Sequence, residues 1–341
     1  MKSNNVLKKI AFVCLITVGT IAFLFGGLVG YFKLPVSAYY NASEKAFKIP
    51  GLKENFVPQG LFYDENEKIF LVSGYNSKAD VASAVYLVNE LGESKKINLA
   101  YSDGSDFCRH SGGIAVYENW MYVAGSSAHA IYVYDYKEAI ECENGASIRA
   151  IGSIPLYNKE DKKNDYINTS ALTVVGDTLI VNEYHYGEEY PLLDSHNFTT
   201  SSGDVHGGYA IFFQLDRRME FGTDGSIGKV FSICDKVQGM TINKGKIYCS
   251  ISYGLGFSYL NEYVESNVKK DGEVTLLGKT YPVYSLDSFC LLRSYKMPPM
   301  GECVAFVGSD FYVISEFASN KYILGKFTGA SWCYKTDLAK M

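Results

Sequence analysis

Residues 59–75 read QGLFYDENEKIFLVSGY, which is a pair of short apolar runs separated by a polar turn. Both runs are rich in Val, Ile, Phe and Tyr, as is typical of β-strands. Glu65 and Asn66, between the runs, belong to the residue types that occur in tight turns. The stretch therefore predicts a β-hairpin, and the apolar run AVYLVNE at 84–90 can add a third strand to it.

The same pattern occurs four more times, with starts 53 to 68 residues apart. The copies are GGIAVYENWMYVAGSS at 112–127, SALTVVGDTLIVNEYHY at 170–186, QGMTINKGKIYCSISYG at 238–254 and ECVAFVGSDFYVISEFA at 302–318. A further strand-like run precedes each copy, so the repeating unit is a four-stranded antiparallel meander. One such unit cannot bury both of its faces, whereas several units arranged around an axis form the blades of a β-propeller.

The number of blades follows from the two ends of the repeat region. The last copy, which starts at Glu302, lacks a fourth strand, whereas an orphan strand-like run at Ala46–Pro50 precedes the first copy. We therefore predict an all-β propeller of five four-stranded blades, in which Ala46–Pro50 pairs beside the strand after Glu316 and closes the ring. Two alternatives stay open. The orphan run is a free edge strand, or the long interval around Glu188–Gly208 hides a sixth blade.

The N-terminus has the composition of a membrane anchor. Residues 10–32 carry no charged side chain, and the basic residues Lys2, Lys8 and Lys9 precede them. A run of this length crosses a bilayer as one helix, and a short basic end stays in the cytoplasm. The sequence therefore predicts a single-pass protein of the cell membrane, held there by a signal anchor, whose C-terminal part is extracytoplasmic.

This anchor suggests a division of the chain into three parts. We expect a cytoplasmic stub and transmembrane anchor at 1–33, a linker at 34–43, and an extracytoplasmic propeller domain at 44–341. Pro35 should end the helix because proline lacks a backbone donor. The alternative is a secreted protein, because the small residues of Val36–Ala38 offer a signal-peptidase cleavage site.

Charge and motifs exclude several classes of protein. The net charge is −5, and beyond residue 33 it is −9, from 28 basic and 37 acidic residues, so a nucleic-acid surface is not expected. The sequence contains no GxSxG, HExxH, Walker A or CxxC motif, which removes the enzyme classes that use them. Seven cysteines lie beyond the anchor, an odd number that cannot pair completely. The sequence allows one disulfide among Cys108, Cys142, Cys290 and Cys333 but does not identify the pair.

Four segments carry a resemblance to known proteins: FVPQGLFYD at 56–64, HSGGIAVYENWMYVAG at 110–125, VQGMTINKGKIYCSISYG at 237–254 and MPPMGECVAF at 297–306. They resemble secreted or membrane-anchored bacterial β-propeller proteins of uncertain activity. More distantly, they are similar to the superfamily of NHL-repeat, strictosidine-synthase-like and gluconolactonase-like propellers. The resemblance implies the propeller fold. The lactonase-like enzymes bind a divalent metal, but their ligands have no residue-by-residue match here, so none is transferred.

The expected functional site is the axial face of the propeller. The innermost strand of a blade starts at the face where the second strand ends, so residues at these two places converge on the central channel. The candidate ligand-binding residues at this face are Gln59, Arg109, His110, Ser170, Gln238 and Tyr253. The long polar loop at 193–208 is a candidate lid over the same face.

Three glutamates at this face suggest a binding site for a cation. Carboxylate oxygens of Glu183, Glu302 and Glu316 suit calcium or another divalent cation. The alternative is that these glutamates accept hydrogen bonds from backbone amides and simply close the channel. A third interpretation is catalytic, because Glu183 or Glu302 paired with His110 or His185 could serve as general acid and base.

These observations predict a membrane-anchored extracytoplasmic propeller that binds a ligand or partner at its axial face. The ligand class stays open between a small molecule, a carbohydrate and a protein, with a divalent cation as a candidate cofactor. The first alternative is a hydrolase of lactonase or glycosidase type that uses the axial carboxylates and histidines. The second alternative is a structural scaffold.

Overall fold

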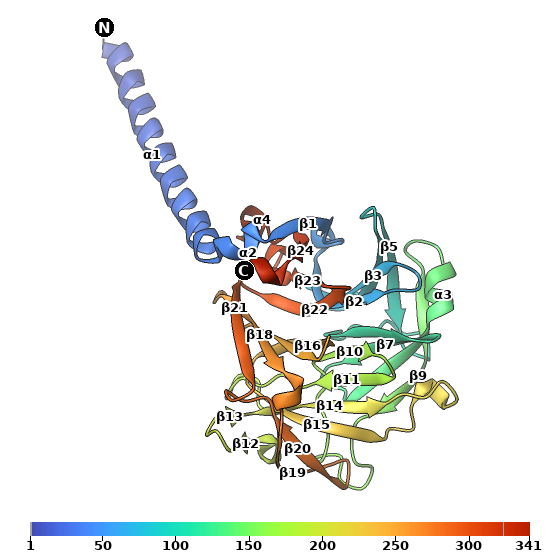
Figure 1. Ribbon diagram of the computed structural model, residues 1–341. Coiled ribbons are helices and arrows are strands. Elements are labelled where there is room, and N and C mark those ends of the chain that lie inside the picture. Colours follow the sequence, from blue (N-terminus) through green and yellow to red (C-terminus); the bar gives the residue numbers. More distant parts are fainter. Residues whose placement is uncertain (1, 323) are drawn as a thin grey trace.

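The computed structural model describes residues 2–322 and 324–341, the side chains of residues 2–8 excepted. A long N-terminal helix, α1 (Lys2–Lys33), projects from a body of antiparallel sheets arranged around an axis (Figure 1). The antiparallel pairings form five blades of four strands each, and the outer strands of the first two blades also pair in parallel, so the predicted five-bladed propeller is confirmed.

Each blade runs from an inner strand at the axis to an outer strand at the rim. Blade 1 comprises β2 (Phe56–Asp64), β3 (Ile69–Asn76), β4 (Ala84–Asn89) and β5 (Ser94–Ala100). Blade 2 comprises β6 (Ile114–Tyr117), β7 (Trp120–Gly125), β8 (Ala130–Asp135) and β9 (Ser147–Pro155). Blade 3 comprises β10 (Ala171–Val175), β11 (Thr178–Asn182), β14 (Gly208–Gln214) and β15 (Ile227–Ile233). Blade 4 comprises β16 (Val237–Asn243), β17 (Lys246–Ile251), β18 (Ser258–Val264) and β21 (Leu291–Met297). Blade 5 comprises β22 (Gly301–Val307), β23 (Asp310–Ser315), β24 (Trp332–Thr336) and β1 (Ser43–Lys48).

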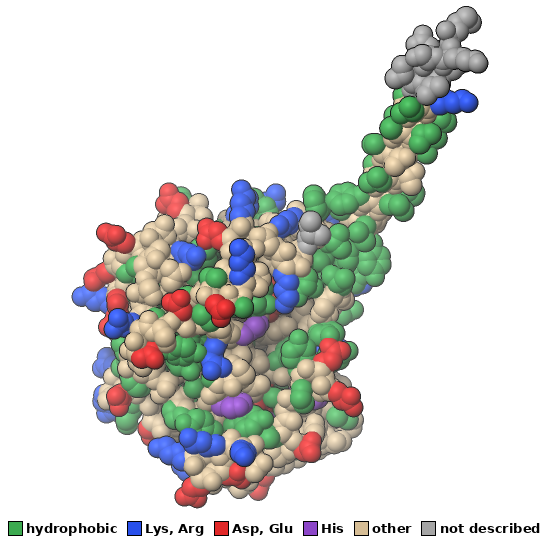
Figure 2. Space-filling view, turned by 180° about the vertical axis from the view of Figure 1, so that it is seen from behind, with side chains coloured by type: hydrophobic (Ala, Val, Ile, Leu, Met, Phe, Trp, Pro, Cys, Tyr) green, Lys and Arg blue, Asp and Glu red, His purple; other side chains and the backbone are tan. Residues whose placement is uncertain are grey.

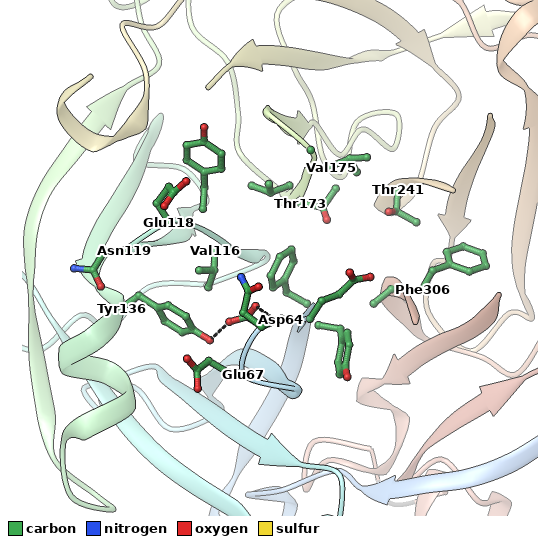
Figure 3. Close-up of a pocket in the computed structure, with 18 of the residues that line it drawn as sticks. Asp64, Glu67, Val116, Glu118, Asn119, Tyr136, Thr173, Val175, Thr241 and Phe306 are labelled. Carbon is green, nitrogen blue, oxygen red and sulfur yellow. Dashed lines mark hydrogen bonds between the residues drawn. The ribbon is translucent and has the colours of Figure 1, made fainter. Parts of the chain in front are cut away.

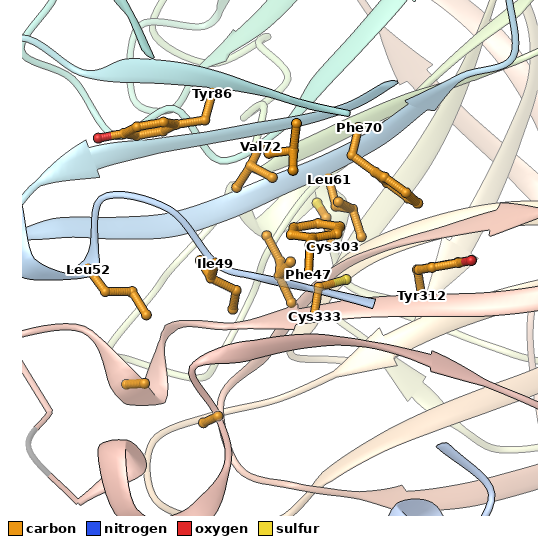
Figure 4. Close-up of a cluster of buried hydrophobic side chains, with 14 of the residues drawn as sticks. Phe47, Ile49, Leu52, Leu61, Phe70, Val72, Tyr86, Cys303, Tyr312 and Cys333 are labelled. Atoms are coloured by element: carbon orange, nitrogen blue, oxygen red, sulfur yellow. The ribbon is translucent and has the colours of Figure 1, made fainter. Parts of the chain in front are cut away.

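The ring closes as the sequence predicts, because a strand from the N-terminal side of the repeats completes the last blade. Strand β1, from the N-terminal side of the repeats, pairs antiparallel with β24 from the end of the chain, and Phe47 lies opposite Cys333. The backbone NH of Ile49 also donates to the carbonyl of Ser331 at 2.9 Å. The alternative of a free edge strand is therefore wrong. Figure 4 shows Phe47 and Cys333 packed with Phe70 in the buried cluster between blades 5 and 1.

Two insertions interrupt the blade pattern. The long interval within blade 3 is a loop with a short hairpin, β12 (Phe198–Thr199) and β13 (Val205–His206), rather than a sixth blade. A second hairpin, β19 (Lys270–Leu276) and β20 (Lys279–Ser285), is inserted in blade 4 and pairs in parallel with β15 of blade 3. The sequence patterns did not predict this second hairpin.

The N-terminal helix is continuous, as expected, and ends directly before Pro35. The helical stretch Lys9–Asn41 is long and apolar enough to cross a membrane, a property that it shares with signal sequences. The segment expected as a linker is instead helical and packed on the propeller, through a 3-10 turn and α2 (Ser37–Asn41). The cause is apolar burial, because Val36 and Tyr39 are almost fully enclosed by side chains of blades 4 and 5. Figure 2 shows hydrophobic side chains that continue from the helix onto the propeller body.

Small residues allow the five inner strands to meet at the axis. A Cβ atom on Gly113 would lie 2.2 Å from the backbone nitrogen of Leu172, and one on Gly239 would lie 2.8 Å from the Cα of Cys303. The thiol of Cys303 contacts the carbonyl oxygens of Gly112, at 3.5 Å, and Gln238, at 3.4 Å, which belong to the inner-strand regions of blades 2 and 4. The middle of the axis is therefore filled, and a separate cavity lies at each end of it.

The open question of a disulfide is settled by the cysteine positions. All eight cysteines, each of which lies in the described part of the chain, are unpaired. Cys249 and Cys303 are buried among apolar neighbours, as the strand patterns suggest.

Candidate functional site

The start of each inner strand contributes one side of a cavity of about 650 Å³ on the axial face. The structure brings together the five register positions Gln59, Gly112, Ser170, Gln238 and Glu302. They converge because each blade enters its inner strand at the same end of the axis. This cavity is the one that the repeat register predicts, and it is large enough for a small ligand.

The most unusual group in the cavity is the carboxyl of Glu302. Its side chain is 3% exposed, and within the described residues no hydrogen bond reaches its oxygens. Burial, reinforced by the nearby Glu316 carboxyl, raises the pKa of Glu302 well above its usual value, and the Lys321 ammonium opposes this rise only in part. Burial therefore favours the protonated form of Glu302, which can donate a hydrogen bond into the cavity.

Glu316 lies beside Glu302 in a more polar environment. Its carboxylate accepts a hydrogen bond from Nε2 of Gln59 at 3.1 Å. Burial raises the pKa of Glu316, and the positive charge of Lys321 and the hydrogen bond from Gln59 offset this rise only in part. The two carboxyl groups thus differ in their partners, because Gln59 donates to Glu316 and no such donor reaches Glu302 among the described residues.

His110 and Lys321 form the wall next to Tyr75. The ring of His110 packs on Tyr75 with centroids 4.5 Å apart, and Nζ of Lys321 donates to the Tyr75 hydroxyl at 3.0 Å. His110 is an exposed residue at the edge of the cavity. Desolvation by the neighbouring protein atoms, together with the Lys321 charge, lowers the pKa of His110 to about 4. His110 is therefore neutral at physiological pH.

Tyrosines cover the opposite wall. Tyr184 packs edge-on against Tyr190 at 5.2 Å, and Tyr186 lies against Tyr253 at 4.3 Å between ring centroids. The hydroxyl of Tyr253 donates to Glu189, and that of Tyr184 donates to the carbonyl of Ser252 at 3.2 Å. Such rings offer flat apolar faces with polar edges, which suit both stacking and hydrogen bonding.

Glu183 does not take part in this site, which corrects the prediction of a three-glutamate centre. It is 1% exposed, and its oxygens accept from the backbone NH groups of Asn168, at 3.0 Å, and Tyr209, at 3.1 Å. Nδ1 of His196 lies 2.8 Å away. Burial lowers the pKa of His196, but the Glu183 charge outweighs it, so the net shift is upward. Strand β11 ends at Asn182, and the chain then turns the carboxylate toward the start of β14.

The predicted cation site is accordingly not assembled. Within residues 2–322 and 324–341, no group of three His, Cys, Asp or Glu side chains lies close enough to hold a metal ion. The reason is local, because Glu183 is occupied by backbone donors, so that of the three predicted glutamates Glu302 and Glu316 reach the cavity.

Two further candidates also lie outside the cavity. Nδ1 of His185 lies 2.7 Å from the Asp235 carboxylate, in the loops between blades 3 and 4. The Nε group of Arg109 donates to the hydroxyl of Tyr101 at 2.7 Å, so this guanidinium points toward blade 1. Neither side chain lines the cavity.

Several lining residues were not predicted. Lys321 and Tyr322 come from the loop after β23, and Tyr190 and Pro191 come from the long loop of blade 3. They lie outside the repeated hairpins, so register could not find them. The candidate lid at 193–208 is not over the cavity. It forms the β12–β13 hairpin, which packs against β19, and only the residues just before it reach the site.

A second and wider cavity, of about 1090 Å³, lies at the opposite end of the inner strands (Figure 3). The hairpin turns of the five blades line it. Its buried carboxylate, Asp64, already accepts from the Tyr136 hydroxyl at 2.6 Å and from the backbone NH of Asn66 at 2.9 Å. The other acidic side chains, such as Glu67 and Glu118, are exposed on turns. The axial cavity is the better candidate because its polar groups converge and include an unpartnered one.

Fold and site together define a five-bladed β-propeller with an apolar N-terminal helix and a polar axial cavity. No family model matches the chain, and no curated protein is similar to it. Solved structures of propeller-type proteins are distantly similar in fold.

Three of these structures illustrate the distance. The PQQ-bound aldose sugar dehydrogenase of Streptomyces coelicolor is 14% identical, with 86% of this chain and 95% of that chain covered and a TM-score of 0.45. A putative 6-phosphogluconolactonase of Bacteroides fragilis is 11% identical, with 76% and 77% covered and a TM-score of 0.38. The hydrazine synthase of Kuenenia stuttgartiensis is 9% identical, with a TM-score of 0.36. It covers 76% of this chain, which spans only 55% of that one. Similarities this distant assign no activity to the chain.

Proposed function

We propose that this protein is a membrane-anchored propeller that binds a small, uncharged, hydroxyl-rich ligand of the carbohydrate class in its axial cavity. The observation that carries the proposal is the enclosed, unpartnered carboxyl of Glu302. The Glu302 oxygens border the cavity rather than the closed interior, so a ligand there can supply their hydrogen-bond partner.

The charges of the cavity favour a neutral ligand. His110 is neutral at physiological pH, and burial raises the pKa of Glu302 and of Glu316, which favours their uncharged forms. Besides Glu189, whose carboxylate accepts from Tyr253, the remaining polar groups are hydroxyls and amides, which can both donate and accept hydrogen bonds. Sugar hydroxyls match such groups, and the apolar faces of sugar rings stack on tyrosines such as Tyr253.

The anchor part of the proposal rests on the buried residues around the candidate cleavage site. Phe32 and Val36, both before Ala38, are buried in contact with the propeller. Cleavage after Ala38 would remove these two side chains and leave apolar surface without a partner. We therefore favour an uncleaved anchor over a secreted protein, with the propeller outside the cytoplasm.

A thermal-shift screen of the full chain with neutral monosaccharides and disaccharides tests the binding proposal. The detergent must not carry a sugar head group, because such a detergent would compete for the site. We expect at least one sugar to raise the melting temperature of the wild type and of Glu67→Gln, which alters the opposite cavity. The same sugar should not stabilise Glu302→Leu. If no neutral sugar stabilises the wild type, the proposal fails.

A hydrolase is the second candidate, and the unlike environments of Glu302 and Glu316 favour it. Two neighbouring carboxyl groups in unlike environments, with burial favouring the protonated form of Glu302, suit a general acid and its partner in glycoside cleavage. Glu302→Gln separates the two functions, because glutamine keeps a hydrogen-bond donor but cannot deliver a proton. A hydrolase would lose turnover while sugar binding persists, whereas a pure binding protein shows no turnover in either form.

A further inference from the structure

Two loops that line the axial cavity also contact helix α1. The first follows β23 and contributes Lys321 and Tyr322 to the cavity. Five residues beyond Tyr322, in the short helix α4 (Gly325–Thr328), Phe327 packs edge-on against Phe25 of α1 with ring centroids 4.8 Å apart. The wall of the cavity and the surface of the helix are thus parts of one loop.

The second loop connects β17 to β18 and repeats this arrangement from the neighbouring blade. Gly254 and Leu255 line the cavity. Two residues later, Phe257 lies 6.0 Å from Tyr31 of α1, and Nζ of Lys296 lies 4.1 Å from the Phe257 ring. The helix therefore meets the propeller on the side where the axial cavity opens.

The position of these contacts along α1 sets their depth. Phe25 lies eight residues before Lys33, which is about 12 Å along a helix. A bilayer that surrounds the uncharged run would therefore reach the level of Phe327. Phe327 is 52% exposed and Leu255 is 53% exposed, so both present apolar surface to whatever surrounds the helix. Figure 2 shows that the apolar area at the base of the helix borders a hollow on the same face of the propeller.

We propose that the axial cavity opens at the membrane surface and receives the uncharged, hydroxylated head group of a membrane lipid. Leu255 and Phe327 form an apolar path from the cavity rim to α1, along which the lipid tail remains in the bilayer. This inference rests on the proposed binding function and adds the source of the ligand. A lipid fits better than a free sugar because a rim built for a soluble ligand would not need exposed apolar side chains beside the anchor.

The orientation can be tested without any ligand. The full chain is reconstituted in phosphatidylcholine nanodiscs, with or without brominated lipid that quenches tryptophan fluorescence. We expect Leu255→Trp to add emission that brominated lipid quenches. The matched control is Phe289→Trp, because Phe289 is 78% exposed but adjoins Ser288, whose backbone NH donates to Asp204, beside β13 and well away from α1 in Figure 1. Equal, weak quenching of both variants would overturn the inference, whatever the cavity binds.

The ligand source is tested with a monoglycosyl diacylglycerol. Nanodiscs that contain it should slow hydrogen exchange in the two rim loops of the wild type, and phosphatidylcholine alone should not. Phe327→Ser should lose this protection but keep its thermal shift with a soluble sugar, and Phe289→Ser should behave as the wild type.

The outcomes separate the inference from the proposed function. If the soluble sugar binds and the glycolipid does not protect the loops, the membrane source is wrong and the binding proposal stands. If neither binds, both are wrong. If the lipid protects Phe327→Ser as strongly as the wild type, the apolar path is wrong.

Discussion

Glu302 shows how the fold creates chemistry at the scale of one residue. It begins an inner strand, where five blades converge, and is therefore surrounded by protein rather than water. Gln59, which lines the same cavity, donates to Glu316 instead. A carboxyl in this position costs stability when ionised, so burial raises its pKa and favours its protonated form.

The raised pKa of Glu302 predicts a pH-dependent stability difference. A carboxyl whose pKa is higher in the folded state binds more protons folded than unfolded. Stability is therefore favoured below the unfolded pKa of about 4.3 and is lost as pH rises toward the folded pKa. We expect the wild type to lose stability relative to Glu302→Gln by up to about 1.4 kcal/mol per pH unit in that window. Urea denaturation of both proteins between pH 5 and pH 8 measures this difference in the free energy of unfolding. A difference that does not change with pH would show that Glu302 is ionised throughout this range.

The candidate residues show what register can and cannot predict. Gln59, Gln238 and Glu302 line one cavity because they occupy the same position in three copies of one repeat. Glu183 was misplaced because it follows the last residue of β11, where register no longer fixes direction. Lys321 lies in a loop without periodicity, so nothing in the pattern connects it to the cavity.

At the scale of elements, the ring depends on inner strands that lack bulky side chains where they meet. The repeat predicted the hairpin that contains each inner strand, but it did not explain the small residue, such as Gly113 or Gly239, at the second position of a repeat. That reason is the close approach of neighbouring blades, which only the assembled ring reveals. Similarly, the inserted β19–β20 hairpin pairs with another blade, a contact that no local pattern encodes.

This close approach predicts that Gly113→Ala is strongly destabilising. Its Cβ would lie 2.2 Å from the backbone nitrogen of Leu172, so the strands would have to separate. We expect a loss of about 3 kcal/mol in the free energy of unfolding. Gly228→Ala is the matched control, because its Cβ would make an ordinary contact of 3.7 Å with the Phe212 carbonyl oxygen. Equal stability of the two variants in urea titrations would refute the close packing of the axis.

The closing strand β1 predicts the effect of truncation. A chain that lacks residues 1–48 loses β1, so the backbone of β24 becomes an open edge and Phe47 leaves the core. Open edges pair with other chains, so we expect oligomers on light scattering. A chain that lacks only residues 1–30 keeps β1, Phe32 and Val36 and should be monomeric. Monomers from both truncations would contradict closure by β1.

At the scale of the whole molecule, the helix and the propeller form one packed unit rather than two parts on a flexible tether. Phe32, Val36 and Tyr39 connect them through buried contacts. The acidic propeller domain, with its excess of Asp and Glu, should be repelled by anionic lipids. The apolar contacts near α1 would then hold the cavity close to an uncharged part of the membrane surface.

The packed junction predicts an uncleaved protein. Intact-mass measurement of the chain purified from the membrane fraction should include residues 1–38, because Val36 is part of the fold. Removal of these residues should also lower the melting temperature of the propeller. A mature chain that begins at Tyr39 and is freely soluble would show a cleaved signal sequence instead.

The most direct test of the central claim is calorimetric titration of the full chain with the sugar that stabilises it best. The claim is that the axial cavity around Glu302 holds an uncharged hydroxylated ligand. We predict one binding site per chain, affinity at least about tenfold weaker in Glu302→Leu, a loss of about 1.4 kcal/mol, and unchanged affinity in Glu67→Gln. Equal affinities in all three proteins, or a loss in Glu67→Gln alone, would place the ligand elsewhere and contradict the claim.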